Sequence, residues 1–174
     1  MAYRSSEKTR QKKDAKRTAM MQAAVRVFAA KGYHAATVRD IVNSADVAVG
    51  TFYFYFPDKE TLFVHLYEET ADFLLHTIYQ AMRNKRGALN QLEHGIRAYM
   101  NLAIYEPAVV QLLLLAGLGA VPALALKRTR FREKMQKLWQ RPLDEAEALP
   151  AQNNTISASA IAGACDEVVL YVLG

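Results

Sequence analysis

The stretch that decides the fold is Thr37-Val-Arg-Asp-Ile-Val-Asn-Ser-Ala-Asp-Val-Ala-Val-Gly-Thr-Phe-Tyr-Phe-Tyr-Phe-Pro-Asp-Lys-Glu60. Thr37 and Asp40 have the spacing of a capping box, so we expect a helix to begin at Val38. Asp46 adopts a left-handed turn more readily than most residues, and a second helix is expected from about Ala48. Two short helices joined by a tight turn form a helix-turn-helix, whose second helix fits the major groove of DNA.

The side chains of this unit divide into expected base readers and expected phosphate contacts. Arg39 can donate two hydrogen bonds to guanine. Val49 and the Thr51 methyl can contact thymine methyl groups, while Gly50 lets the backbone approach the DNA. Hydroxyl groups, a helix N-terminus and a lysine suit phosphate oxygens, and the contacts expected on this ground are Thr37, Tyr53, Tyr55 and Lys59. The phenylalanines of the aromatic run are expected to pack inward or against neighbouring helices, namely Phe52, Phe54 and Phe56.

These residues closely resemble the TetR family of transcriptional regulators. The motifs that carry the resemblance lie between Met21 and Phe63 and are Phe28-Ala-Ala-Lys-Gly-Tyr33, Ala36-Thr-Val-Arg-Asp-Ile41, Val49-Gly-Thr-Phe-Tyr53 and Tyr55-Phe-Pro-Asp-Lys-Glu60. In that family the segment is the N-terminal DNA-binding domain of an all-helical homodimer, and the remaining helices hold a small-molecule pocket. The resemblance implies a repressor that leaves a palindromic operator when its effector binds. Two residues depart from the family pattern: Asp46 replaces the usual glycine, and Ala48 replaces a serine that commonly caps the recognition helix.

The remaining sequence predicts an all-α fold, because helical periodicity continues after residue 18 and no strand alternation interrupts it. We expect a basic flexible arm at 1–17, the DNA-binding domain at 18–58, and a ligand-binding and dimerisation domain at 59–174. The arm holds seven basic and two acidic side chains, which equals the whole net charge of +5. Such an arm suits attraction to phosphate, and a solvated leader is an equal alternative.

Several helix boundaries are also predicted. Gly32 should end the first helix, and Asp58 should cap a long fourth helix after Pro57. The apolar run 108–126 approaches the length of a membrane span, but Gly117-Leu-Gly119 and Pro122 should divide it into two buried helices, so we expect no membrane association. A loop is expected between Pro142 and the asparagine pair 153–154.

The last helical face ends in mid-pattern, whereas family members usually finish with two helices that form the dimer seam. Either the sequence is truncated, the chain omits residues, or the dimer uses another seam. Small residues between Ala158 and Ala164 would permit close packing across a twofold axis, or equally within one subunit.

An apolar core with a few hydroxyl groups suits a small hydrophobic effector, and the same side chains are equally suited to filling the core. The candidate ligand-binding residues are Tyr67, Thr70, Phe73, Leu74, Tyr99, Met100, Leu113, Phe131, Met135 and Trp139. The run 112–119, followed by the basic segment Lys127-Arg-Thr-Arg-Phe-Arg132, is similar to family members that respond to fatty acyl-CoA. CoA phosphates would then meet Lys127, Arg128, Arg130 or Arg132; a solvated basic face is the alternative.

Other chemistry has little support in the sequence. No nucleophile with a base and no glycine-rich phosphate loop is found, so we expect no enzyme activity and no cofactor. His65, Glu69, Asp72 and His76 share one helix face but extend over three turns, which favours a solvated stripe over a metal site. Cys165 has no cysteine partner, and no signal-peptide core follows Met1, so a cytoplasmic protein is expected. A nonspecific architectural DNA-binding protein is the alternative function.

Overall fold

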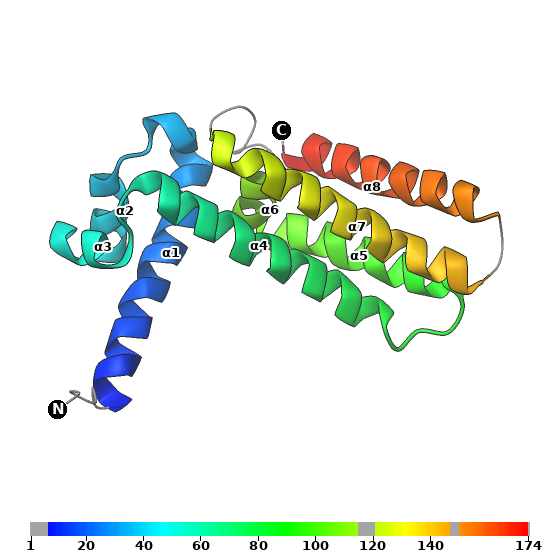
Figure 1. Ribbon diagram of the computed structural model, residues 1–174, viewed down its shortest axis with the longest axis horizontal. Helices are drawn as coiled ribbons and strands as arrows, with labels where there is room; N and C mark the ends of the chain where they lie inside the picture. The colour runs from blue at the N-terminus through cyan, green and yellow to red at the C-terminus, as the bar shows by residue number, and fades with distance from the viewer. Residues whose placement is uncertain (1–6, 115–120, 147–149, 174) are drawn as a thin grey trace. The chain divides into compact units, whose positions relative to one another are not determined.

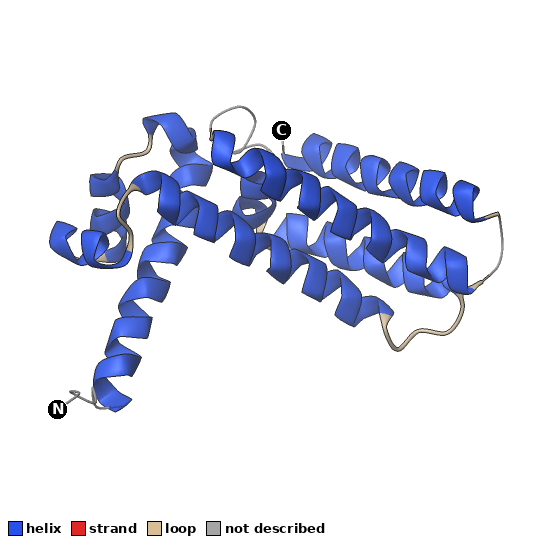
Figure 2. Ribbon diagram, viewed as in Figure 1, coloured by secondary structure: helices blue, strands red, loops and turns tan. Residues whose placement is uncertain are grey.

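The structure is a computed structural model that describes residues 7–114, 121–146 and 150–173 (Figure 1). Within these ranges the chain forms helices and loops and no strand, which confirms the all-α prediction (Figure 2). The helices are α1 Glu7–Ala35, α2 Val38–Ala45, α3 Val49–Tyr55, α4 Lys59–Met82, α5 Ala88–Tyr105, α6 Pro107–Leu114, a 3-10 turn Pro122–Leu124, α7 Ala125–Glu145 and α8 Ala151–Leu173.

The chain divides into two compact units, Met1–Leu66 and Tyr67–Gly174. The division lies inside α4, so the first turns of this helix belong to the N-terminal unit. α1 already begins at Glu7, within the segment expected to be a flexible arm. Residues 7–17 contain no glycine or proline and are rich in Lys, Arg, Gln and Glu, all good helix formers, which explains the helical backbone there.

The core of the N-terminal unit is built from the apolar faces of four helices. Phe28 of α1 packs edge-on against Phe63 of α4 with 4.8 Å between ring centroids. Ile41 and Val42 of α2 are buried, and the fully buried Phe52 anchors α3. α2 is too short to be stable alone, so this burial is what holds it in place.

The inward prediction was right for Phe52 and Phe56 and wrong for Phe54, which is 66% exposed. A step of two residues along a helix turns the side-chain direction by about 200°, so Phe52 and Phe54 point to opposite faces of α3 and cannot both be buried. The alternation of Phe and Tyr therefore places one phenylalanine on the outer surface of α3.

The C-terminal unit packs α4, α5, α7 and α8 around three fully buried aromatic residues, Tyr67, Tyr99 and Trp139. Gly95 of α5 is required at the closest approach. A Cβ atom there would lie 2.7 Å from both Met82 Sδ and Trp139 Cζ3, well inside van der Waals contact. The absence of a side chain at residue 95 thus lets α5 lie close against α4 and α7.

Two loop predictions in this unit have different outcomes. Pro142 was expected in a loop, but it lies inside α7 and is buried, and the Ala146 amide donates to its carbonyl over 3.1 Å. Burial of the ring offsets the missing N–H, so the helix continues, and α8 begins at Ala151, before the asparagine pair. The expected turn at 117–119 lies outside the described residues.

Candidate nucleic-acid interface

A capping box fixes the start of α2, as predicted. The Asp40 amide donates to Thr37 Oγ1 over 3.1 Å, while Asp40 Oδ2 accepts from the Thr37 amide over 2.9 Å and from its hydroxyl over 2.8 Å. Lys31 Nζ donates to Asp40 Oδ1 over 2.7 Å. This bond from Lys31, followed by the bonds from Thr37, lowers the pKa of Asp40 to about 2. One carboxylate therefore joins the end of α1 to the start of α2.

The turn between α2 and α3 also follows the prediction. Asp46 has φ 52° and ψ 51° and is the one non-glycine residue with positive φ in the described ranges. The Val47 amide donates to the Val42 carbonyl over 3.0 Å, which closes the end of α2. Ala48 precedes α3 in extended conformation and provides no side-chain hydrogen bond. α3 therefore begins without the cap that a serine would supply.

The outer surface of α3 carries most of the expected base readers. Val49 is 44% exposed and Tyr53 is 56% exposed, and the glycine at position 50 is exposed as well. Thr51 and Tyr55 are half-buried, and Arg39 on α2 is exposed. The residues expected to read bases are thus available to a partner. Phe54, which sequence reasoning assigned to the core, adds an exposed aromatic ring to the same helix.

Lys59 has a different position from the one expected for a phosphate contact. Its Nζ donates to the carbonyls of Tyr33 over 2.7 Å and Ala36 over 2.8 Å, and it lies 4.4 Å from the centre of the Tyr33 ring. These are carbonyls at the C-terminal end of α1, where a cation is favourable. The ammonium group therefore ties α4 to α1 with two of its three N–H groups, and the phosphate contact of Lys59 stays a prediction.

Thr37 is also held by hydrogen bonds inside the protein. Its hydroxyl both accepts from the Asp40 amide and donates to the Asp40 carboxylate, and its own amide is bound to the same carboxylate. A hydroxyl group has one proton to donate, so a phosphate oxygen would have to displace Asp40. Of the expected contacts, Thr37, Arg39, Val49, Gly50 and Tyr53 are exposed, and Thr51, Tyr55 and Lys59 are half-buried.

The candidate ligand-binding residues form the core of the C-terminal unit, with one exception. Phe73 is 51% exposed, so its expected place in the interior was wrong, although Thr70, three residues earlier, is buried. Met100 is half-buried. The buried members are Tyr67, Thr70, Leu74, Tyr99, Leu113, Phe131, Met135 and Trp139.

Polar groups inside this core are few. Tyr99 Oη donates to Asp166 Oδ1 over 2.7 Å, joining α5 to α8. Burial raises the pKa of Tyr67 to about 12 and also raises that of Asp166. Trp139 Nε1 is buried and finds no acceptor within the described part of the chain. Cys165 is buried, and desolvation raises the pKa of its thiol to about 11, as expected of an unreactive core residue.

The basic segment of α7 is partly used inside the protein. Lys127 forms an ion pair with Glu68, and Lys134 pairs with Asp72 over 3.0 Å. Arg130 and Arg132 are exposed. Over residues 7–114, 121–146 and 150–173 no group of three or more His, Cys, Asp or Glu side chains converges.

Comparison with known proteins agrees with this geometry. Residues 20–66 match the N-terminal domain of bacterial regulatory proteins of the tetR family. The chain is 32% identical over 83 residues to the fatty acid metabolism regulator protein of Bacillus subtilis (strain 168), covering 48% of this chain and 43% of that protein. It is 27% identical over 141 residues to the transcriptional repressor KstR2 of Mycolicibacterium smegmatis, covering 76% and 65%. The chain thus spans less than two thirds of either relative.

Solved structures show the same fold over most of the chain. The fatty acid degradation regulator FadR from Bacillus halodurans is 26% identical, with a TM-score of 0.76 over 88% of this chain and 82% of that one. The regulator FadR from Bacillus subtilis, solved in complex with stearoyl-CoA, is 24% identical, with a TM-score of 0.76 over 87% and 84%. These relatives are regulators of transcription, a class distinct from enzymes. Residues 20–66 therefore form a helix-turn-helix domain of the tetR family of bacterial regulatory proteins, and a C-terminal helical unit follows it.

Proposed function

We propose that this protein is a cytoplasmic, homodimeric repressor that reads a palindromic operator through α3 and leaves it when a hydrophobic effector binds. The observation that carries the proposal is the surface of α3, where Val49 and Tyr53 are exposed above the buried Phe52. Gly50 lies on this surface, and a Cβ atom there would have no neighbour within 4 Å. Glycine lowers helix stability by about 1 kcal/mol relative to alanine. Nothing in the described part of the chain needs it, and close approach of DNA gives it a role.

Gly50→Ala tests this role directly. The variant should fold with equal or slightly higher stability, because alanine favours the helix and meets no neighbour. Its operator affinity should nevertheless fall, since the new methyl group stands between the α3 backbone and the DNA. Unfolding by urea and operator binding by fluorescence anisotropy measure the two effects separately. Full operator affinity in Gly50→Ala would remove the main support for the proposal.

Tyr53 and Arg39 are proposed to make different kinds of contact. Tyr53→Phe should weaken binding to all sequences by about tenfold, through loss of a hydrogen bond to phosphate. Tyr105→Phe is the matched control, because Tyr105 is 77% exposed on α5 and outside this surface. Arg39→Gln should instead alter the preferred bases. Footprinting should show one protected palindrome, whereas uniform protection of any duplex would favour an architectural protein.

The dimer seam is proposed to lie on α8. Val168, Tyr171 and Val172 are 50%, 88% and 55% exposed on this helix. The segment Asn153–Leu173 is long and apolar enough to cross a membrane, with a mean hydropathy of 1.6. Only 17% of its 18-residue apolar stretch is buried. A second copy of the chain would cover this face, as the family resemblance implies. Sedimentation without detergent should show a dimer that Val168→Glu dissociates; a monomer that binds lipid vesicles would contradict the assignment.

A fatty acyl-CoA is the proposed effector. One relative is a fatty acid metabolism regulator, and another was solved with stearoyl-CoA. In this chain, the buried Trp139 Nε1 has no described acceptor, and an unsatisfied buried donor costs about 1–3 kcal/mol. A ligand carbonyl entering the core would relieve that cost. Arg128 and Arg132 contribute positive charge near Tyr67, on the side where CoA phosphates are proposed to bind.

The effector would act by population shift, binding the conformation that does not fit the operator more tightly than the one that does. Trp139 is the sole tryptophan, so its emission reports on the core without interference. Stearoyl-CoA should change that emission saturably and release the operator over the same concentration range. Saturable binding without operator release would refute stearoyl-CoA as the effector, even if DNA binding is confirmed.

A further inference from the structure

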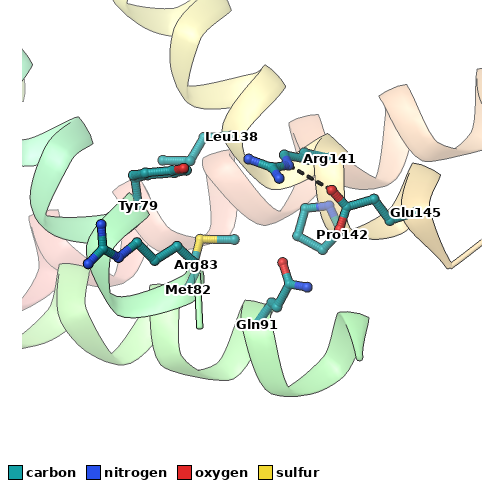
Figure 3. Close-up of a pocket in the computed structure, with 8 residues that line it drawn as sticks. All are labelled: Tyr79, Met82, Arg83, Gln91, Leu138, Arg141, Pro142 and Glu145. Atoms are coloured by element: carbon teal, nitrogen blue, oxygen red, sulfur yellow. Dashed lines mark hydrogen bonds and ion pairs between the residues drawn. The ribbon is translucent and has the colours of Figure 1, made fainter. Parts of the chain in front are cut away.

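A small cavity opens at one end of the C-terminal unit, and none of the residues assigned to the effector lines it. Its volume is about 50 Å³, and its walls come from the end of α4, the start of α5 and the end of α7. Figure 3 shows the eight lining residues, which are Tyr79, Met82, Arg83, Gln91, Leu138, Arg141, Pro142 and Glu145. We call this cavity the α4–α5–α7 notch. A cavity needs about 10–15 Å³ of such volume to hold one water molecule, so the notch has room for a small polar group.

Hydrogen-bond donors dominate the polar walls of the notch. The Tyr79 hydroxyl and the Arg141 guanidinium point toward each other, and the guanidinium carbon lies 6.0 Å from the centre of the tyrosine ring (Figure 3). Gln91 brings its side-chain amide from α5. Met82, Leu138 and Pro142 supply apolar surface. The planar, fork-shaped guanidinium of arginine, a tyrosine hydroxyl and a side-chain amide together form a set of donors suited to an oxyanion.

The charge balance around the notch is positive. Glu145 is its one carboxylate, and Arg141 Nε binds Glu145 Oε1 over 2.7 Å. That bond neutralises Glu145 and fixes the guanidinium. Arg141 also bonds the Tyr79 side chain, and Gln91 bonds Glu145, so the N–H and O–H groups that these bonds leave over are the ones that meet a ligand. Arg83 lies at the rim with its guanidinium directed away from Arg141 (Figure 3). Lys85 and Arg86 follow it in the segment between α4 and α5. No ion pair of these three side chains is found within the described ranges, so their positive charge attracts anions.

The walls are held by packing that does not depend on a ligand. Met82 and Trp139 meet at Gly95, which fixes α5 against α4 and α7 next to the notch. Pro142 is buried and has no backbone N–H, so it gives a stiff apolar wall without competing for the ligand. A site formed in this way binds without first having to be ordered, which favours even a small ligand.

We infer that the α4–α5–α7 notch binds a small oxyanion, the carboxylate or phosphate group of a ligand whose remainder lies outside, as a second input to the regulatory unit. Arg141, Tyr79 and Gln91 hold the oxyanion, and Arg83 draws it to the rim. This inference goes beyond the proposed function, because operator binding and release by an acyl-CoA use other residues. The two proposals can therefore be tested independently.

The test is a titration of the full chain by two-dimensional ¹H–¹⁵N NMR with sodium butyrate, sodium phosphate and, at matched ionic strength, sodium chloride. The Gln91 side-chain amide and the Arg141 Nε signals should shift saturably with butyrate or phosphate and not with chloride. Saturation by butyrate alone identifies a carboxylate site, and saturation by phosphate alone identifies a phosphate site. No saturation by either anion would overturn the inference.

Three variants make the test specific to the notch. Arg141→Gln should weaken binding about tenfold or more, because it removes the charged donor. Arg83→Gln should weaken it severalfold while leaving the Arg141–Glu145 pair intact. Arg97→Gln is the matched control, since Arg97 Nη2 binds Glu93 Oε1 over 2.7 Å in another exposed pair four residues apart. Equal weakening in Arg97→Gln and Arg141→Gln would show a general charge effect and overturn the inference.

Discussion

Replacing Lys59 by methionine separates a structural role from a DNA contact. The substitution keeps most of the aliphatic stem and removes the ammonium that donates to Tyr33 O over 2.7 Å and Ala36 O over 2.8 Å. Hydrogen bonds that involve a charged group contribute about 1.5–3 kcal/mol each, and the contact with the Tyr33 ring adds about 0.5–1 kcal/mol. The site is half-buried, so water can replace part of this. We expect a loss of about 2–3 kcal/mol in the free energy of unfolding.

The assay has two readouts, urea unfolding followed by circular dichroism and operator affinity measured at several salt concentrations. A lysine that binds phosphate contributes about one unit to the slope of log K against log salt, whereas a structural lysine leaves the slope unchanged. Lys31→Met is the matched control, because Lys31 forms an exposed ion pair with Asp40. Its expected loss of stability is below about 1 kcal/mol. Lys59→Met with normal stability and a slope reduced by one unit would refute the structural assignment.

Three further predictions concern stability. Gly95→Ala should lower the free energy of unfolding by about 1–3 kcal/mol, because its Cβ would lie 2.7 Å from Met82 Sδ and from Trp139 Cζ3; an unchanged urea midpoint would contradict that packing. Ala48→Ser should stabilise α3 by about 0.5–1 kcal/mol by supplying the missing N-cap hydroxyl, and thermal unfolding measures the gain. Asp40 has a folded pKa of about 2, below its unfolded value, so its stabilisation is present above about pH 4 and is lost as the pH falls toward 2. The stability difference between the parent chain and Asp40→Asn should therefore shrink over that range, and a constant difference would contradict the ion pair.

Features that depend on neighbouring residues could be predicted from the sequence. The Thr37–Asp40 box, the left-handed Asp46 and the Asp58 cap, which accepts from the Thr61 amide over 2.6 Å, each involve groups within a few residues of one another. Their geometry follows from local backbone chemistry, so the sequence contains enough information. The same is true of the exposed surface of α3, which follows from the helical period once Phe52 is buried.

Features that depend on distant contacts could not be predicted. Lys59 caps a helix that ends more than twenty residues earlier, and Pro142 remains in α7 because tertiary packing buries its ring. Phe73 satisfied the helical period, yet half of it is exposed. The α4–α5–α7 notch joins Tyr79, Gln91 and Arg141 from three helices, and nothing in the sequence indicates that they meet.

The close approach at Gly95 also restricts which substitutions this protein can tolerate during evolution. Met82, Gly95 and Trp139 share one small volume, so the acceptable residue at each position depends on the other two. A lineage that acquires alanine at 95 should first, or at the same time, acquire a smaller side chain at 82 or 139. Across related genes these three codons are therefore expected to vary together, although the residues are far apart in the chain.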